Sequence, residues 1–196
     1  MARGALVAME GIDGAGKTTQ ARMLADALRA RGREVVLTKE PTDGFVGRRI
    51  RETARTGRLP PEEELELFLE DRKEHVEQLI RPAMARGAVV IVDRYFYSTA
   101  AYQGSRGLDP ADIVARNVAF APIPDVVVLL TIDPADGVGR VRSRDGVENH
   151  FERLEDLVRC EAVFDALVRP EIVRIDGARP IDIVHTDVVD AVTRAL

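Results

Sequence analysis

Residues 11–18 read Gly-Ile-Asp-Gly-Ala-Gly-Lys-Thr and fit the pattern G-x-x-x-x-G-K-[ST]. The apolar segment Ala5–Met9 precedes them, and a helical pattern begins at Lys17. A strand, a glycine-rich loop and a helix in this order form a phosphate-binding loop. Glycine lets backbone N–H groups and the positive end of the helix face an anion. The stretch therefore predicts a fold that binds a nucleoside triphosphate.

We expect this phosphate loop to hold ATP. Lys17 would reach the β- and γ-phosphates, and Thr18 would ligate Mg²⁺. The expected ATP-binding residues are Gly11, Ile12, Asp13, Gly14, Ala15, Gly16, Lys17, Thr18 and Thr19. The alternative is a glycine-rich structural turn, which the flanking strand and helix disfavour.

Short apolar runs alternate with helical patterns along the rest of the chain. The runs are Leu6–Met9, Val35–Leu37, Val89–Val92, Val126–Leu130 and Ile172–Ile175. Four of them lack strict polar alternation, as strands buried on both faces of a parallel sheet do. The predicted helices are Lys17–Arg31, Pro61–Arg86, Asp109–Phe120, Phe151–Val168 and Ile181–Ala195. We predict an α/β, three-layer P-loop NTPase fold, in which helices flank a five-stranded parallel sheet.

Length and composition narrow the class of protein. The chain has 196 residues, 45% hydrophobic and 31% charged, which predicts a single domain over residues 1–196. The net charge of −5 argues against nucleic-acid binding, and no apolar run is long enough to span a membrane. One cysteine, Cys160, excludes a disulfide framework, and three histidines argue against a zinc site. We expect a cytoplasmic protein without a nucleic-acid or membrane partner.

The third apolar run ends in Asp93 and Arg94. An acid at the end of a buried strand suits the position that organises Mg²⁺ in phosphate-loop enzymes, so Asp93 and Thr18 are the predicted metal ligands. Asp93 could instead cap the next helix. A guanidinium beside a buried strand end needs an anionic partner. For Arg94 this is a neighbouring carboxylate or a substrate phosphate.

Two side chains on the helix predicted over residues 61–86 suggest a base-binding site. Phe68 and Arg72 stand four residues apart, beside the apolar stripe of this helix. An aromatic plate next to a five-donor fork could hold a nucleobase by stacking and hydrogen bonding. The plainer interpretation is a core phenylalanine and a surface arginine.

A lid segment is predicted at residues 136–152. Arg140, Arg142 and Arg144 occupy alternate positions there among glycines. On a mobile segment they would close over a triphosphate and neutralise charge on the transferring group. A solvated arginine face is the alternative in so arginine-rich a chain.

Together these motifs resemble the thymidylate kinase family. Residues 7–20 (VAMEGIDGAGKTTQ) resemble its phosphate loop, and residues 38–44 (TKEPTDG) its second signature. Residues 67–75 (LFLEDRKEH) resemble its base-binding helix, and residues 93–104 (DRYFYSTAAYQG) its third signature. With Ala121–Asp125, the matches follow the family order over most of the chain.

The resemblance implies that the γ-phosphoryl group of ATP is transferred to dTMP, giving ADP and dTDP for dTTP biosynthesis. It implies Mg²⁺ as cofactor, a homodimer, and often a cis peptide before the signature proline, here Pro41. It places the acceptor-binding region in residues 39–82. The implied dTMP-binding residues are Asp13, Glu40, Pro41, Arg51, Phe68, Arg72, Arg94, Ser98, Tyr102 and Gln103.

Several of these residues receive a role from the resemblance. Phe68 would stack on thymine, and Arg72 would bond its carbonyl group. Tyr102 would fill the space that a ribose 2′-OH needs. Gln103 or Ser98 would reach the base edge.

The remaining roles concern the sugar and the phosphates. Asp13 would take the 3′-OH, and Arg94, helped by Arg51, would hold the acceptor phosphate. The implied catalytic residues are Lys17, Asp93, Arg94, Arg140, Arg142 and Arg144. Because residues 12–15 contain no arginine, the family pattern places a catalytic arginine in the lid, without choosing among the three.

The sequence departs from the family pattern at two places. Thr42-Asp43 replaces the glycine pair of many bacterial members, near the expected acceptor phosphate. His150 stands where many members carry an arginine. If that arginine is catalytic in relatives, a neighbour takes over its role here or the reaction is slow.

Three other functions are compatible with a phosphate loop. A kinase of another monophosphate or of a deoxynucleoside would share the loop, but Phe68, Arg72 and Tyr102 suit a pyrimidine deoxynucleotide. A nucleotide-binding regulator without turnover is supported only by His150. A DNA-binding ATPase is disfavoured by the net charge and by the lack of a basic aromatic stripe.

Overall fold

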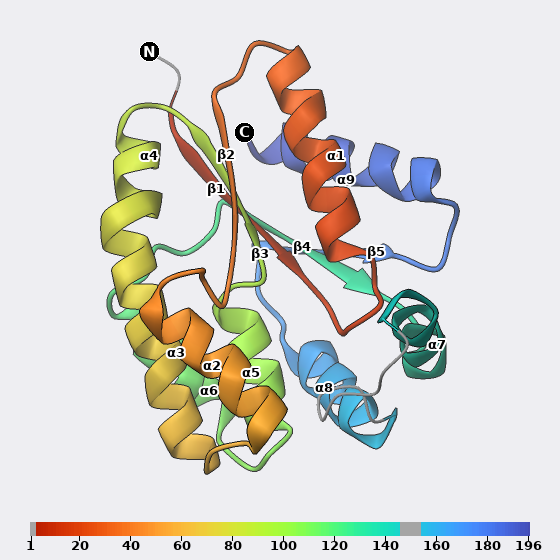
Figure 1. The fold of residues 1–196 in the computed structure, drawn as a ribbon. Coiled ribbons are helices and arrows are strands. Elements are labelled where there is room, and N and C mark those ends of the chain that lie inside the picture. Colours follow the sequence, from red (N-terminus) through yellow and green to blue (C-terminus); the bar gives the residue numbers. More distant parts are fainter. Residues whose placement is uncertain (1–2, 146–153) are drawn as a thin grey trace.

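The sheet lies at the centre of the computed structural model, which describes residues 3–145 and 154–196 (Figure 1). Its strands are β1 (Ala5–Glu10), β2 (Val35–Lys39), β3 (Val89–Asp93), β4 (Val126–Thr131) and β5 (Ile172–Asp176). All four pairings are parallel, and the strand order is β2-β3-β1-β4-β5. The predicted five-stranded parallel sheet is confirmed, and each predicted run lies inside its strand.

Helices cover both faces of the sheet, which confirms the three-layer α/β fold (Figure 1). Helices α1 (Lys17–Ala30) and α9 (Ile181–Ala195) pack together on one face. The other side carries α3 (Pro61–His75), the π-helical turn η1 (Val76–Ile80), α4 (Arg81–Ala85), α5 (Phe96–Gly104), α6 (Pro110–Val118) and α8 (Leu154–Ala166). Helix α2 (Phe45–Thr56) packs on α3, and α7 (Pro134–Asp145) packs on α8. None of the described helices has the length and apolar character of a membrane span.

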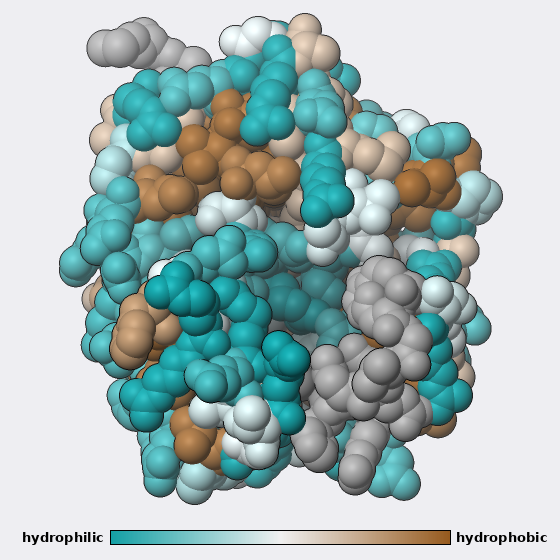
Figure 2. Space-filling view, in the orientation of Figure 1, coloured by the Kyte–Doolittle hydropathy of each residue, from teal (hydrophilic) through white to brown (hydrophobic). Residues whose placement is uncertain are grey.

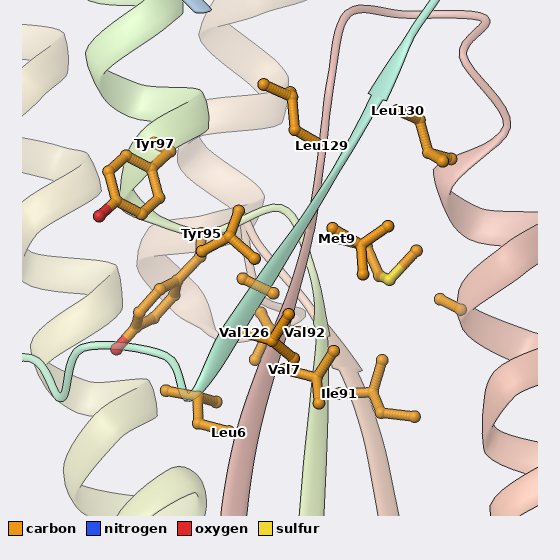
Figure 3. Packing of buried hydrophobic residues seen from close by; sticks show 14 of the residues in the cluster. Leu6, Val7, Met9, Ile91, Val92, Tyr95, Tyr97, Val126, Leu129 and Leu130 are labelled. Atoms are coloured by element: carbon orange, nitrogen blue, oxygen red, sulfur yellow. The ribbon is translucent and has the colours of Figure 1, made fainter. Parts of the chain in front are cut away.

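The apolar composition of the central strands follows from burial on both faces. Every residue of β1 is buried, as are all but the last residue of β3 and of β4. Successive side chains of a strand point to opposite faces. Figure 3 shows Leu129 and Leu130 on opposite sides of β4. Because β1 is the central strand, the phosphate loop that follows it lies at the middle of the carboxyl edge of the sheet.

Two helices were not predicted from the sequence. Helix α5 is short, and seven of its nine residues are buried, so it shows no amphipathic period. Helix α2 is rich in exposed arginine, and its larger buried side chains, Val46, Ile50 and Ala54, recur only every fourth residue. Helix α7 begins two residues before the predicted lid and covers residues 136–145 of it.

Candidate active site

The phosphate loop brings backbone N–H groups and the buried ammonium group of Lys17 together at the start of α1. Gly14 and Gly16 have φ values of 83° and 97°, a region that L side chains rarely adopt. Lys17 opens α1, and its Nζ donates to the carbonyl oxygen of Ile12 at 2.7 Å. Burial, with the nearby charge of Arg94, lowers the pKa of Lys17 to about 8. A helix N-terminus with a buried ammonium forms a site for an anion.

The loop forms the middle of an open cleft of about 620 Å³. Figure 2 shows a hollow with a hydrophilic floor in this part of the molecule. The lining residues with positive charge are Lys17, Lys39, Arg51, Arg94, Arg140 and Arg179, against Asp13, Glu40 and Asp93. A cleft of net positive charge in a chain of net charge −5 attracts anionic ligands.

The cleft extends to both sides of the phosphate loop, because β1 is the central strand. Lys39 and Arg51 line it on the side of β2 and β3. Arg140, Gly177 and Arg179 line it on the side of β4 and β5. Two ligands could therefore meet at the loop from opposite sides.

Thr18 and Asp93 form a pair of oxygen donors in the cleft. The hydroxyl of Thr18 donates to Asp93 Oδ2 at 2.5 Å. Asp93 Oδ1 is buried and has no hydrogen-bond partner among the residues that the structure describes. A carboxylate oxygen with spare capacity beside a hydroxyl is a donor set that suits Mg²⁺.

Arg94 holds a fixed guanidinium over the loop. Its φ is 70°, a conformation that surrounding contacts must maintain in a non-glycine residue. Nη2 donates to Asp13 Oδ1, and Nη1 donates to Ser98 Oγ at 3.2 Å. The guanidinium carbon lies 5.1 Å from the centre of the Tyr102 ring. In this structure the anionic partner of Arg94 is thus a carboxylate, and part of the side chain faces the cleft.

The sequence was compared with protein-family models and with curated proteins. The family model for thymidylate kinase matches residues 9–188. The thymidylate kinase of Xanthomonas euvesicatoria pv. vesicatoria is 52% identical over 179 residues, which are 91% of this chain and 79% of that protein. That of Xylella fastidiosa is 54% identical over 174 residues, 89% of this chain and 80% of that protein. The chain belongs to the thymidylate kinase family. The resemblance of the sequence motifs is thereby confirmed.

The residues predicted for a thymidylate kinase site fall into two groups. The first group lines the cleft: Asp13, Gly14, Ala15, Gly16, Lys17, Thr18, Thr19, Glu40, Pro41, Arg51, Asp93, Arg94 and Arg140. The second group lies outside the lining formed by the described residues: Gly11, Ile12, Phe68, Arg72, Ser98, Tyr102, Gln103 and Arg142. The Glu40–Pro41 peptide is cis, as the thymidylate kinase resemblance implies.

Arg72 is buried at 1% exposure, so the interpretation of a surface arginine is wrong. Its Nε and Nη2 donate to Glu40 Oε2 at 2.8 and 2.5 Å. Nη1 donates to Asn117 Oδ1 at 2.6 Å, and Nη2 also donates to Thr99 Oγ1 at 3.0 Å. Within the part of the chain that the structure describes, four of its five N–H groups are therefore engaged, and one Nη1 hydrogen remains. Phe68 is partly buried and packs on the small cluster that α2 forms with α3.

Gln103 is occupied by a buried polar cluster. Its Nε2 donates to Glu64 Oε2 at 2.6 Å. Glu64 is fully buried and also accepts from Arg58 and Arg106. The expected contact of Gln103 with a base edge stays a prediction. Among the described residues, the amide keeps one Nε2 hydrogen and one Oε1 lone pair beyond its bonds with Glu64 and Arg106.

Among the lid arginines, Arg140 lies in the cleft. Its Nη1 donates to the carbonyl oxygens of Gly177 at 3.1 Å and Gly14 at 3.4 Å. Arg142 is exposed on the same helix. The side chain of Arg144 and residues 146–152, including His150, lie outside the described residues.

Sequence reasoning missed the contribution of the C-terminal part of this thymidylate kinase fold. Gly177, Arg179, Ile181 and Val184 line the cleft from the loop after β5 and from α9. One signal was present, since the fifth apolar run is followed by a turn. In a parallel sheet this turn must lie at the same edge as the phosphate loop.

Proposed function

We propose that this cleft is where the chain, as a thymidylate kinase, transfers the γ-phosphoryl group of ATP to dTMP, giving ADP and dTDP. One observation carries the assignment. The phosphate loop with Lys17 is flanked in the same cleft by further cations, Lys39, Arg51 and Arg94. Two groups of phosphate-binding side chains at one place suit a reaction between two phosphorylated substrates.

The acceptor end needs positive charge and little base catalysis. The phosphate of dTMP is already a nucleophile, whereas the hydroxyl of a nucleoside acceptor requires a general base. Among the carboxylates that line the cleft, Asp13 is paired with Arg94, and Glu40 with Arg72 and His75. Asp93 accepts from Thr18 at Oδ2, and its Oδ1 is the oxygen proposed for Mg²⁺. This arrangement favours a monophosphate acceptor over a nucleoside.

The roles then divide between the two sides of the loop. Lys17 and the loop N–H groups hold the β- and γ-phosphates of ATP. Arg94 and Arg51 hold the acceptor phosphate and align it with the γ-phosphorus. Arg140 enters the cleft from α7 and neutralises charge on the transferring group. Asp13 orients Arg94 and takes the 3′-OH of dTMP.

Mg²⁺ fits the donor pair described above. Thr18 and Asp93 would hold it, since Asp93 Oδ1 has unused acceptor capacity among the described residues. When bound, the ion neutralises charge on the β- and γ-phosphate oxygens. The hydrogen bond from Thr18 keeps the Asp93 carboxylate oriented toward the loop.

A coupled assay tests the proposal. ATP, Mg²⁺ and each nucleoside monophosphate are supplied in turn, and ADP release is followed. We expect dTMP to be preferred, and Arg94→Ala to lower kcat/KM for dTMP on the order of 100-fold. The control is Arg33→Ala, which removes a partly buried arginine outside the cleft lining, whose Nη2 donates to the backbone carbonyl of Arg3. Preference for another monophosphate would remove the roles of Phe68, Arg72 and Tyr102.

A cytoplasmic homodimer built from one domain per chain completes the proposal. The domain spans residues 1–196, with the acceptor region at 39–82 and the lid at 136–152. Val118 and Ile123 expose apolar side chains at and beyond the end of α6, which supports an interface packed through this helix. The buried free thiol of Cys160 supports a reducing location. Sedimentation of the protein at two concentrations would test the dimer.

A further inference from the structure

We propose that Glu10 is a positioning residue for Arg94, because its buried carboxylate caps helix α5 from a neighbouring strand. The inference rests on the proposed role of Arg94 in holding the acceptor phosphate. No step of the proposed reaction uses Glu10, the last residue of β1, and the inference assigns a role to it. Glu10 stands outside the lining that the described residues give the cleft.

The carboxylate of Glu10 is completely buried and makes three hydrogen bonds. Oε1 accepts from the backbone N–H groups of Tyr95 at 2.9 Å and Ser98 at 3.1 Å. Oε2 accepts from the hydroxyl of Ser98. All three donors belong to the first turn of α5 or to its cap residue.

These bonds replace a capping box. In a capping box, the side chain of the N-cap residue accepts from the third residue of the helix, whose side chain accepts from the N-cap N–H. In α5 these positions are Tyr95 and Ser98, and Tyr95 makes no side-chain capping bond. Glu10 accepts from both N–H groups at once. A carboxylate at a helix N-terminus is also favoured by the helix dipole.

The capped turn carries Arg94 immediately before it. The φ of 70° at Arg94 has to be maintained by the residues on either side. On one side, the N–H of Arg94 donates to the carbonyl of Met9, the neighbour of Glu10, at 3.0 Å. On the other side, Glu10 holds Tyr95 and Ser98, and Ser98 Oγ accepts from Arg94 Nη1 at 3.2 Å. The end of β1 thus fixes both the backbone and the guanidinium of Arg94.

Burying the carboxyl group of Glu10 is unfavourable unless hydrogen-bond partners compensate for its lost hydration. The other residues of β1 read ALVAM, and an apolar side chain at position 10 would continue this core strand. Burial raises the pKa of Glu10 to about 7, although its hydrogen bonds with Ser98 and the charge of Arg94 oppose the rise. A fully buried carboxyl group is costly without partners, so its bonds to α5 explain its place.

Two single variants and a matched control test the inference, with dTMP and ATP binding measured separately by calorimetry and folding checked by thermal unfolding. Glu10→Gln removes the charge, and Ser98→Ala removes the hydroxyl that links Glu10 to Arg94. Tyr97→Phe is the matched control, because it removes a hydroxyl of the same helix that donates to Glu171. We expect Glu10→Gln and Ser98→Ala each to raise the Kd for dTMP about tenfold, with the Kd for ATP changed less than about twofold. In the double variant the two effects should not add, since both act through one link.

Two results would overturn the inference. One is an unchanged Kd for dTMP in both variants while Arg94→Ala abolishes dTMP binding, which would leave the proposed function intact. The other is an equal loss of dTMP and ATP affinity, which would indicate general damage to the loop. If Arg94→Ala itself leaves dTMP binding unchanged, the proposed function of Arg94 fails first. If Glu10→Gln does not fold, Ser98→Ala alone decides, because it retains the bonds of Glu10 to both backbone N–H groups.

Discussion

Arg72 Nε donates to Glu40 Oε2 at 2.8 Å, in an ion pair that joins α3 to the end of β2 with both side chains almost fully buried. The other oxygen of Glu40 lies 2.9 Å from His75 Nδ1, and His75 Nε2 lies 2.9 Å from Thr38 Oγ1. The ion pair therefore belongs to a network that surrounds the cis peptide before Pro41. Because it connects the acceptor region to the sheet, it should matter for stability as well as for base binding.

We predict that Arg72→Ala destabilises the fold by about 3–5 kcal/mol, because it leaves the Glu40 carboxylate buried without its main partner. Urea unfolding, followed by circular dichroism, measures the change. Arg29→Ala, which breaks the exposed pair with Asp26, should cost less than about 1 kcal/mol. Equal stability of the two variants would mean that Arg72 serves the ligand alone.

The sheet and the phosphate loop were predictable because their signals are local. Buried strands are continuous apolar runs, and the glycine–lysine spacing identifies the loop that follows the first of them. The position of Asp93 and Arg94 beside this loop follows as well, since parallel strands end at one edge. Each of these inferences depends on residues close together in the chain.

The rest of the site depends on residues that are far apart in sequence. The partners of Arg72 come from the end of β2, from α5 and from α6, and no local pattern shows that they enclose a charge. Arg179 reaches the cleft because β5 lies next to β4, an order that a single sequence does not reveal. Sequence periodicity placed Arg72 beside the core stripe but could not distinguish burial from exposure.

Asp43 should weaken the binding of dTMP. Its Oδ1 lies 3.1 Å from Arg51 Nη2 and 3.2 Å from Lys39 Nζ, two cations of the cleft. The acceptor phosphate would compete with Asp43 for them. Exposed ion pairs contribute up to about 1 kcal/mol each, so we predict that Asp43→Asn lowers KM for dTMP roughly 3-fold at low salt, and less at high salt.

Steady-state kinetics at two ionic strengths would measure this effect of Asp43. Asp26→Asn, which breaks an exposed pair on α1, should leave KM unchanged. A higher KM in Asp43→Asn would show the opposite role, in which Asp43 holds Arg51 in place for the phosphate.

ATP binding should take up a proton at alkaline pH. The pKa of Lys17 is lowered to about 8 by burial and by Arg94, so the free protein loses this charge as the pH rises above 8. Bound phosphates favour the charged form and raise the pKa again. ATP affinity should therefore fall above pH 8, by at most about tenfold per pH unit. Calorimetry at pH 9 in two buffers of different ionisation enthalpy counts the protons, and an uptake of zero there would contradict the prediction.

Glu10 should make the protein less stable as the pH rises from about 4.5 to about 7. Its pKa is raised from 4.5 to about 7 by burial, so the folded state binds the proton more tightly than the unfolded state does. The penalty is absent below pH 4.5 and complete above pH 7, where the shift corresponds to about 3 kcal/mol. Urea unfolding of the wild type and Glu10→Gln at pH 5 and pH 8 isolates this contribution. Parallel pH profiles of the two proteins would show that Glu10 titrates normally.

Helix α7 packs so closely on the phosphate loop at Gly137 that a side chain there should disturb the contact. A Cβ atom at this position would lie 2.6 Å from the carbonyl oxygen of Asp13, well inside contact distance. The backbone of Gly137 is also the nearest neighbour of a Cβ built at Gly14. We predict that Gly137→Ala displaces α7, destabilises the fold by about 1–3 kcal/mol and raises KM for ATP, since Arg140 lies on the same helix.

Gly139 provides the matched control for this prediction. It lies two residues along the same helix, and a Cβ there meets no atom of the described residues within 4 Å, apart from the backbone of its own helix. Gly139→Ala should therefore gain up to about 1 kcal/mol from helix propensity and leave KM for ATP unchanged. Thermal unfolding and steady-state kinetics of both variants make the comparison. If the two alanines have the same effect on KM, the close approach of α7 to the loop is unimportant for ATP, and Arg140 acts independently of it.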